Sequence, residues 1–112
     1  MKKTNENHVT LNIDLREHQR KDIPELMDYL SARINCNIHY VTENKMKNNS
    51  PHIHGVLQTS MSKQTVQRHV NDVFNGSSYK VDYPFDVAGW VGYMTKETKS
   101  VLTAKPTNFY NR

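Results

Sequence analysis

The sequence predicts an α+β fold in which helices pack against one antiparallel sheet. Short segments with alternating apolar and polar residues indicate strands, and longer segments with apolar residues three and four apart indicate helices. These segments follow the order strand, helix, strand, strand, helix, strand, with a further helix near the end. The chain has 112 residues, the size of one ordinary domain. We therefore expect residues 1–112 to form a single domain.

The first strand and the first helix have clear patterns. From His8 to Leu15 every second residue is apolar, as expected of a strand with one buried face. The following apolar residues recur at helical spacing as far as Ile34. Asp22 is suited to begin this helix, and Pro24 is tolerated in a first helical turn.

The middle of the sequence predicts a hairpin. Residues 37–43 (NIHYVTE) and 52–58 (HIHGVLQ) each fit a strand. A basic, asparagine-rich loop of residues 44–50 joins them, and Pro51 ends that loop. Because strands joined by a loop of this kind pair with each other, we expect them to be antiparallel neighbours.

The second half predicts a helix, a strand and a last helix. Ser62 is a typical capping residue, and Asn75-Gly76 stops the helix that follows it. Residues 78–83 (SYKVDY) fit a fourth strand, and Asp86 is suited to begin the last helix, over residues 87–97. The polar residues 98–112 predict a flexible tail.

The first six elements have the β-α-β-β-α-β order of a ferredoxin-like, or RRM-like, fold. In that fold two helices cover one face of a four-stranded antiparallel sheet. The other face is then open, and we expect the last helix to lie near it.

Composition narrows the class of protein. The net charge is +4 and the pI is about 9.2, which suits a polyanionic partner without requiring one. The single cysteine, Cys36, excludes an intrachain disulfide and a cysteine-based zinc site. The N-terminal MKKTNENHVT lacks the apolar stretch of a signal peptide, and no apolar run is long enough to span a bilayer. We therefore expect a soluble, cytoplasmic protein that does not contact a membrane.

His52 and His54 are candidate metal ligands. Residues two apart in a strand point to the same face, about 6–7 Å from each other, and imidazoles bind divalent ions. An isolated pair of this kind is more often an exposed polar surface. Glu43, across the hairpin loop, completes a set of two histidines and one carboxylate that suits Mg²⁺ or Mn²⁺. His39 is an alternative third ligand, but it lies about 13 Å further along its strand.

The last predicted helix carries a candidate nucleophile. Val87, Val91 and Met94 form its apolar stripe, and Tyr93 lies on the flank of the stripe with Lys96 one turn further on. Taken alone, Tyr93 would be read as a boundary aromatic and Lys96 as a surface charge. Gly89 and Gly92 fall on the polar side of the helix, and either close approach of a nucleic-acid backbone or a bent helix would explain them.

Together these residues resemble the HUH endonucleases, and most closely their replication-initiator (Rep) branch. Thr10-Leu11-Asn12 looks like the first motif of that branch. Glu43 and Pro51-His52-Ile53-His54 look like its metal motif, and Tyr93-Met94-Thr95-Lys96 looks like its nucleophile motif. The tyrosine follows the histidine pair, as in the Rep branch and unlike the mobilisation relaxases. No second tyrosine lies between residues 86 and 99, so the resemblance is to a one-tyrosine enzyme.

The resemblance implies a nuclease that nicks and rejoins single-stranded DNA at a replication origin. A divalent ion, Mn²⁺ or Mg²⁺, held by Glu43, His52 and His54 would polarise the scissile phosphate. Tyr93 would attack it, keep the 5′-phosphate as a covalent link and release a 3′-OH that primes rolling-circle replication. Lys96 would steady the phosphate or help position the metal. Family members also have a fifth strand, to which the sequence assigns no segment.

DNA contacts and partners follow from the same resemblance. Thr10 and Asn12 lie in the motif at the DNA-binding end, and Lys45 and Lys47 in the loop beside the metal are expected to contact the DNA backbone. Arg68 and Lys80 are weaker candidates, and Tyr83 or Trp90 is suited to stack on exposed bases. Host replication proteins are expected partners, and self-association is compatible with the sequence.

Two other functions compete with the nicking enzyme. One is a non-catalytic module that binds single-stranded nucleic acid on its open sheet face, as RRM domains do. The third predicted strand presents histidines there in place of aromatics, which counts against this reading. The other is a metal-dependent phosphoesterase in which water attacks in place of Tyr93.

Overall fold

The computed structural model describes residues 7–15, 22–45, 50–84, 86–96 and 100–111, with the backbone alone at residues 44, 45, 50 and 51. Within these ranges the chain forms five strands and four helices. In chain order they are β1 (Asn7–Asp14), α1 (Ile23–Ile34), β2 (Ile38–Lys45), β3 (Ser50–Thr59), α2 (Lys63–Val73), β4 (Ser78–Asp82), α3 (Val87–Met94), β5 (Leu102–Ala104) and α4 (Pro106–Tyr110).

The strands form one antiparallel sheet in the order β4-β1-β3-β2-β5. The first four strands have the element order and antiparallel pairing of the ferredoxin-like plan. The predicted α+β fold class is therefore confirmed. The fifth strand extends the sheet beyond β2.

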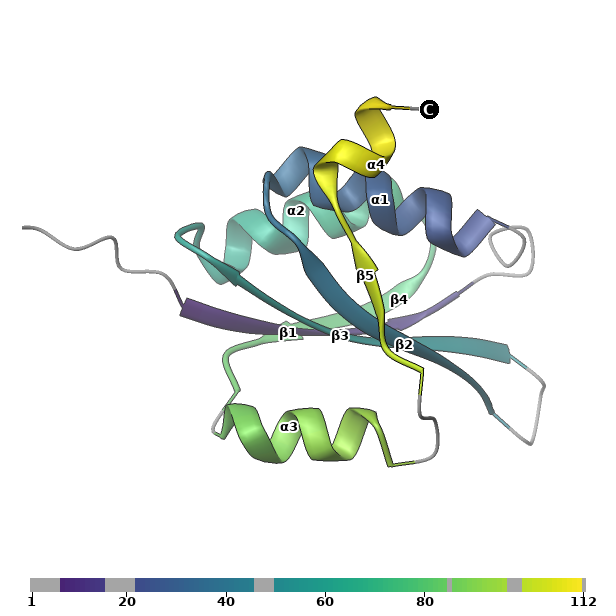
Figure 1. Cartoon of the computed structure of the whole chain (residues 1–112), viewed down its shortest axis with the longest axis vertical. Coiled ribbons are helices and arrows are strands. Elements are labelled where there is room, and N and C mark those ends of the chain that lie inside the picture. Colours follow the sequence, from purple (N-terminus) through teal and green to yellow (C-terminus); the bar gives the residue numbers. More distant parts are fainter. Residues whose placement is uncertain (1–6, 16–21, 46–49, 85, 97–99, 112) are drawn as a thin grey trace, which may run out of the picture.

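Helices lie on both faces of the sheet, as Figure 1 shows: α1, α2 and α4 on one face and α3 on the other. The face under α1 and α2 holds the main core, to which alternate residues of β1 contribute Val9, Leu11 and Ile13. We call this the core face, and the opposite one the α3 face. Because strand side chains alternate, Thr10, Asn12 and Asp14 belong to the α3 face.

Local sequence accounts for the ends of α1 and α2. Ser62 Oγ accepts a hydrogen bond from the backbone N–H of Thr65 (3.2 Å), which caps α2 as predicted. Asn35, with φ 65°, ends α1 in the left-handed conformation, and Gly76, with φ 89°, supplies the turn after α2. Asp22 precedes α1 but makes no side-chain capping bond.

The predicted flexible tail of residues 98–112 is wrong over residues 102–110. Leu102–Ala104 form β5, whose residues pair with Ile38 to Tyr40 of β2. Pro106–Tyr110 form α4, which packs on α1. The helix predicted over residues 87–97 is also shorter in the structure, where α3 ends at Met94.

The helices also bear on the expected absence of a membrane contact. In the ranges that the structure describes, none of them is both long and apolar enough to cross a bilayer.

Candidate active site

The pairing of three strands gathers acidic and imidazole side chains on the α3 face. β3 lies between β1 and β2, and its His52 is opposite Asp14 of β1 on one side and Glu43 of β2 on the other. His54, two residues on, faces Asn12 and Val41. The two histidine rings lie side by side, with their centroids 4.4 Å apart. The predicted closeness of Glu43, His52 and His54 therefore agrees with the strand register.

Each histidine contacts one carboxylate. His54 Nε2 lies 2.9 Å from Glu43 Oε1, and His52 Nδ1 contacts Asp14 Oδ1. Both imidazoles are buried, whereas the two carboxylates are partly exposed. The carboxylates thus form the solvent side of a small polar centre whose imidazoles are held inside.

His54 is incompletely satisfied by its protein neighbours. Its Nδ1 is buried and has no hydrogen-bond partner among the described residues. Buried ring nitrogens are normally paired with a protein group, a water or an ion. The unpaired nitrogen is thus Nδ1, whereas Nε2 is the nitrogen that faces Glu43.

The residues fit a divalent ion in chemistry and partly in geometry. Two ligands at 2.0–2.1 Å on adjacent corners of an octahedron are about 3 Å apart, and Glu43 Oε1 and His54 Nε2 are 2.9 Å apart. His52 is turned toward Asp14. Across the described part of the chain, no three His, Cys, Asp or Glu side chains are gathered closely enough to hold a metal ion. Two of the predicted ligands are in place, and binding would require His52 to reorient.

Tyr93 lies over the same centre, although it is 39 residues further along the chain than His54. Their rings meet edge to face with centroids 5.4 Å apart. Tyr93 is in the last turn of α3 and is 56% exposed, and its hydroxyl has no hydrogen-bond partner among the described residues. The phenol is therefore accessible to a substrate that enters the centre.

Two contacts fix α3 on the sheet. Met94 is buried against Val41 and Val56 in a small cluster that is separate from the main core. Trp90 packs on this cluster and donates a hydrogen bond from Nε1 to the carbonyl oxygen of Gly55 (3.2 Å). Val91, which the sequence places in the apolar stripe, is instead 39% exposed. The helix thus rests on its Trp90 and Met94 side.

The sequence predicts Lys96 in a helical turn beside Tyr93, but the structure places it outside the helix. It follows the end of α3, where its backbone N–H donates to the carbonyl oxygen of Tyr93 (3.2 Å). Its side chain is exposed and has no ion-pair partner among the described residues. A turn therefore places the backbone of Lys96 beside that of Tyr93.

The predicted DNA contacts fare differently. Thr10 is 4% exposed and donates from Oγ1 to the carbonyl oxygen of Asp82 (3.2 Å). It therefore ties β1 to β4, and its predicted DNA contact stays a prediction. Asn12 is half-buried on the α3 face beside His54. Lys45 is the last residue of β2, but its side chain and the whole of Lys47 lie outside the described residues.

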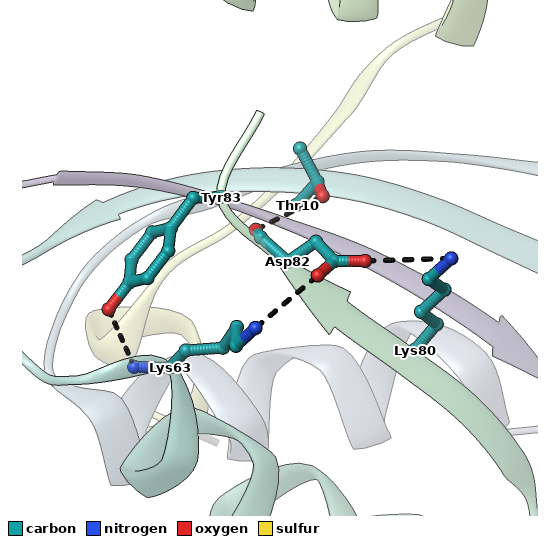
Figure 2. Close-up of polar contacts among 5 residues, drawn as sticks. All are labelled: Thr10, Lys63, Lys80, Asp82 and Tyr83. Carbon is teal, nitrogen blue, oxygen red and sulfur yellow. Dashed lines mark hydrogen bonds and ion pairs between the residues drawn. The ribbon is translucent and has the colours of Figure 1, made fainter. Parts of the chain in front are cut away.

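The β4 edge carries a basic group that Figure 2 shows in detail. Lys63 Nζ lies 3.5 Å and Lys80 Nζ 3.7 Å from the carboxylate oxygens of Asp82. Lys63 also donates from its backbone N–H to the hydroxyl of Tyr83 (3.1 Å), whose ring is half exposed. Two cations share one carboxylate, so this edge keeps a net positive charge. Lys80 is 76% exposed, whereas Thr10 is buried.

Asp14 is the site residue that sequence reasoning missed. It is the last residue of β1 and its alternation with Ile13 places it on the α3 face. The sequence did contain a signal, because polar residues alternate with apolar ones along this strand and Asp14 is one of the polar ones. It becomes informative once β1 is known to lie next to the histidine strand.

Comparisons with known proteins add little. No protein-family model matches the chain, and no curated protein matches it. Among solved structures the chain is similar to a de novo designed protein, Foldit4, at 17% sequence identity and a TM-score of 0.48. That match covers 72% of this chain and 98% of the designed one.

Proposed function

We propose that this protein is a metal-dependent endonuclease of the HUH Rep type that nicks and rejoins single-stranded DNA through Tyr93. The observation that supports this most is the meeting of α3 with the hairpin of β2 and β3 at one point. The ring of Tyr93 lies 5.4 Å from the ring of His54, whose Nε2 is 2.9 Å from Glu43. A phenol, an imidazole pair and a carboxylate are the groups that the resemblance requires.

Tyr93 is suited to act as the nucleophile because it is exposed and its hydroxyl is not engaged by the described residues. In the proposed reaction its oxygen attacks the scissile phosphorus in line with the leaving 3′ oxygen. A new bond joins the tyrosine oxygen to the phosphorus and the bond from phosphorus to the 3′ oxygen breaks. The tyrosine proton is lost to solvent, and the 3′ oxygen takes up a proton to become a free 3′-OH.

The reverse reaction follows from the same geometry. The phosphotyrosine is a phosphodiester like the bond that was broken, so an incoming 3′-OH can attack it and release Tyr93. This step rejoins DNA strands without an external energy source. Nicking, priming from the 3′-OH and rejoining are the three steps that initiate and end rolling-circle replication.

Glu43, His52 and His54 would hold a Mn²⁺ or Mg²⁺ ion, which when bound supplies positive charge against the non-bridging oxygens of the phosphate. Asp14 contacts His52 Nδ1, which leaves the other ring nitrogen as the one to face such an ion. Glu43 comes from β2 and the two histidines from β3, and His52 would have to reorient to join the other two.

Positive side chains along the α3 face would contact the DNA backbone. Lys96 lies just after Tyr93 and is exposed, and Lys80 lies at the β4 edge. Both would neutralise phosphates of the bound strand. We further propose that the protein acts in the cytoplasm at a replication origin, with host replication proteins as partners.

The test is covalent capture of DNA. Wild type and Tyr93→Phe are incubated with Mn²⁺ and 5′- or 3′-labelled single-stranded oligonucleotides with a randomised internal sequence. We expect a protein–DNA adduct that survives denaturing electrophoresis in the wild type alone, with the label on the 3′ side of the nick. EDTA should remove both nicking and adduct.

The same assay separates the competing functions. Equal cutting by both proteins without an adduct would mean that water attacks, as in a phosphoesterase. Binding without cutting by either protein would mean a non-catalytic module. Tyr110→Phe is the control, because it removes an exposed phenol (68%) on α4, on the other face of the sheet from Tyr93, and it should still form the adduct.

A further inference from the structure

A cleft lies beside α3 on the side that carries Tyr93. It has a volume of about 360 Å³ and is lined by Pro84, Asp86, Gly89, Trp90 and Tyr93. This volume is in the lower part of the range for small-molecule sites. Because Tyr93 lines the cleft and also contacts His54, the cleft opens directly next to the proposed active site.

The walls of the cleft are flat and mostly apolar. Trp90 and Tyr93 form an aromatic wall, with ring centroids 5.5 Å apart and planes tilted by 38°. The indole of Trp90 is held in place by its hydrogen bond to Gly55. Pro84 provides a further apolar surface. Rigid aromatic walls of this kind bind flat rings by stacking.

Among the described residues that line the cleft, Asp86 is the one with a charged side chain. Asp86 is the residue before α3, where an aspartate normally accepts a hydrogen bond from the first turn, but its side chain makes no such bond. Its backbone carbonyl accepts from the N–H of Trp90 (2.9 Å), but its carboxylate has no hydrogen-bond or ion-pair partner among the described residues. A Cβ added at Gly89 would lie 2.8 Å from Asp86 Oδ2. The carboxylate therefore lies along the helix in space that a glycine leaves open.

The charge in the cleft decides which part of a nucleotide it can take. None of the described lining residues is a lysine, an arginine or a histidine, and a carboxylate repels phosphate. A carboxylate accepts hydrogen bonds and donates none. The ligand must therefore present a flat ring with donors on its edge, as a nucleobase does.

Guanine is the base whose edge matches a carboxylate best. Its N1–H and its 2-amino group are adjacent donors, so both carboxylate oxygens can accept at once. In adenine and cytosine a ring nitrogen that accepts lies beside the amino group, and in thymine two carbonyl oxygens flank the single N–H. Each of these would set an acceptor against a carboxylate oxygen.

We propose that this cleft binds a guanine base of the nucleotide next to the scissile phosphate, with Asp86 as the residue that specifies it. The assignment rests on the proposed function for the nature of the ligand, single-stranded DNA. It goes further in naming a base and the residue that recognises it. Trp90 and Tyr93 stack on the base, and Gly89 leaves room for the carboxylate.

Trp90 provides the measurement, because it is the one tryptophan of the chain and lines the cleft. The full chain, with no metal added, is titrated with the pentanucleotides TTGTT, TTATT, TTCTT and TTTTT while tryptophan fluorescence is followed. We expect TTGTT to bind about tenfold more tightly than the others, the usual discrimination of a bidentate contact. Hypoxanthine in place of guanine, which lacks the 2-amino group, should lose most of this preference.

Three variants sharpen the test. Asp86→Asn, with one acceptor and one donor, should abolish the preference for guanine. Gly89→Ala, whose methyl group displaces the carboxylate, should weaken it. Glu25→Gln removes an exposed carboxylate on α1, on the other side of the sheet, and should leave it unchanged.

The outcomes are separable from those of the nicking assay. Equal binding of all four oligonucleotides, no binding of any, or a preference that survives in Asp86→Asn would each overturn the assignment. Tyr93→Phe should retain the preference even though it cannot form an adduct. A guanine preference without any nicking would support guanine binding in the cleft and contradict the nuclease proposal. Nicking without a guanine preference would support the nuclease proposal and contradict guanine binding.

Discussion

The two faces of the sheet differ in almost every respect. The core face is covered by α1, α2 and α4 and buries large apolar side chains such as Phe74, Leu11 and Leu30. The α3 face is covered by one short helix and buries three apolar side chains, Val41, Val56 and Met94, in its described cluster. The rest of that face is polar, with two buried histidines and their carboxylates.

The comparison teaches how a domain of this size combines a stable fold with a reactive surface. Apolar burial on the core face supplies most of the free energy of folding. Buried imidazoles and carboxylates on the α3 face contribute little and cost desolvation. Substitutions on the two faces should therefore have separable effects, on stability for one and on chemistry for the other.

The largest effect on the α3 face is expected from Tyr93→Phe. Loss of the nucleophile should lower adduct formation at least about a thousandfold, as with other covalent catalysts. Since the side chain is 56% exposed, the free energy of unfolding should change by less than about 0.5 kcal/mol. Adduct yield and urea unfolding measure the two. A large loss of stability would show that the faces are not separable at this residue.

On the core face the largest expected effect is that of Phe74→Ala. Phe74 is fully buried, and truncation of such a phenylalanine costs about 3–5 kcal/mol. Met94→Ala on the α3 face should cost less, about 2 kcal/mol, because it sits in the smaller cluster. Urea unfolding of the two variants checks this order, and a larger loss at Met94 would reverse the comparison.

Next in size is the effect of Asp14 on metal affinity. Asp14→Asn removes the carboxylate that contacts His52, and loss of such a supporting group typically weakens metal binding about 10- to 100-fold. Titration calorimetry with Mn²⁺ measures it without reference to nicking. Asp72→Asn, which removes a carboxylate paired with Arg33 on the helical side, is the control and should bind Mn²⁺ normally. If Asp14→Asn binds Mn²⁺ as tightly as the wild type does, Asp14 does not support the metal site.

Tyr40 tests the core face at alkaline pH. Burial, and then the nearby Asp28 carboxylate, raises the pKa of Tyr40 from 10.0 to about 12. The folded protein thus holds this proton more tightly than the unfolded chain does. The resulting stability, on the order of 1–3 kcal/mol, is complete below pH 10 and lost as the pH rises through about 12. The free energy of unfolding, measured by urea unfolding at several pH values, should fall less with pH in Tyr40→Phe than in the wild type over this interval.

The smallest effect is expected at His69, where α2 meets α1. Partial burial, and then the guanidinium of Arg33, lowers the pKa of His69 below 6.5, and Arg33 Nε donates to its Nδ1 (3.1 Å). The unfolded chain therefore binds this proton more readily than the folded protein does. Its contribution to stability is complete above pH 6.5 and lost as the pH falls through the lowered pKa. The stability difference between the wild type and His69→Gln should shrink on acidification, and a difference that grows would contradict the sign.

Much of this fold could be predicted from local pattern. Apolar residues alternate along β1 and recur three and four apart along α1 because each element buries one face. Both elements can therefore be predicted from the sequence alone. β5 was missed because it has three residues, and its pairing with β2 depends on strand register rather than on its own apolar pattern. The predicted tail failed for this reason.

The candidate site divides in the same way. His52, His54 and Glu43 could be grouped from the sequence because a hairpin brings them together locally. Asp14 reaches His52 through the pairing of β1 with β3, whereas the described residues that line the cleft beside Asp86 all lie between positions 84 and 93. The place of Asp14 therefore depends on a contact between remote segments, which composition and spacing do not encode.

The placement of α3 between β4 and β5 has a mechanical consequence. These are the two outermost strands of the sheet, at opposite edges, so the nucleophile is carried on a span that is tethered at both borders. Deleting the segment from residue 101 onward would remove no residue of the proposed centre, yet it would cut one tether. Tyr93 would then be attached through one end of α3 only, and its position over His54 would be held less tightly.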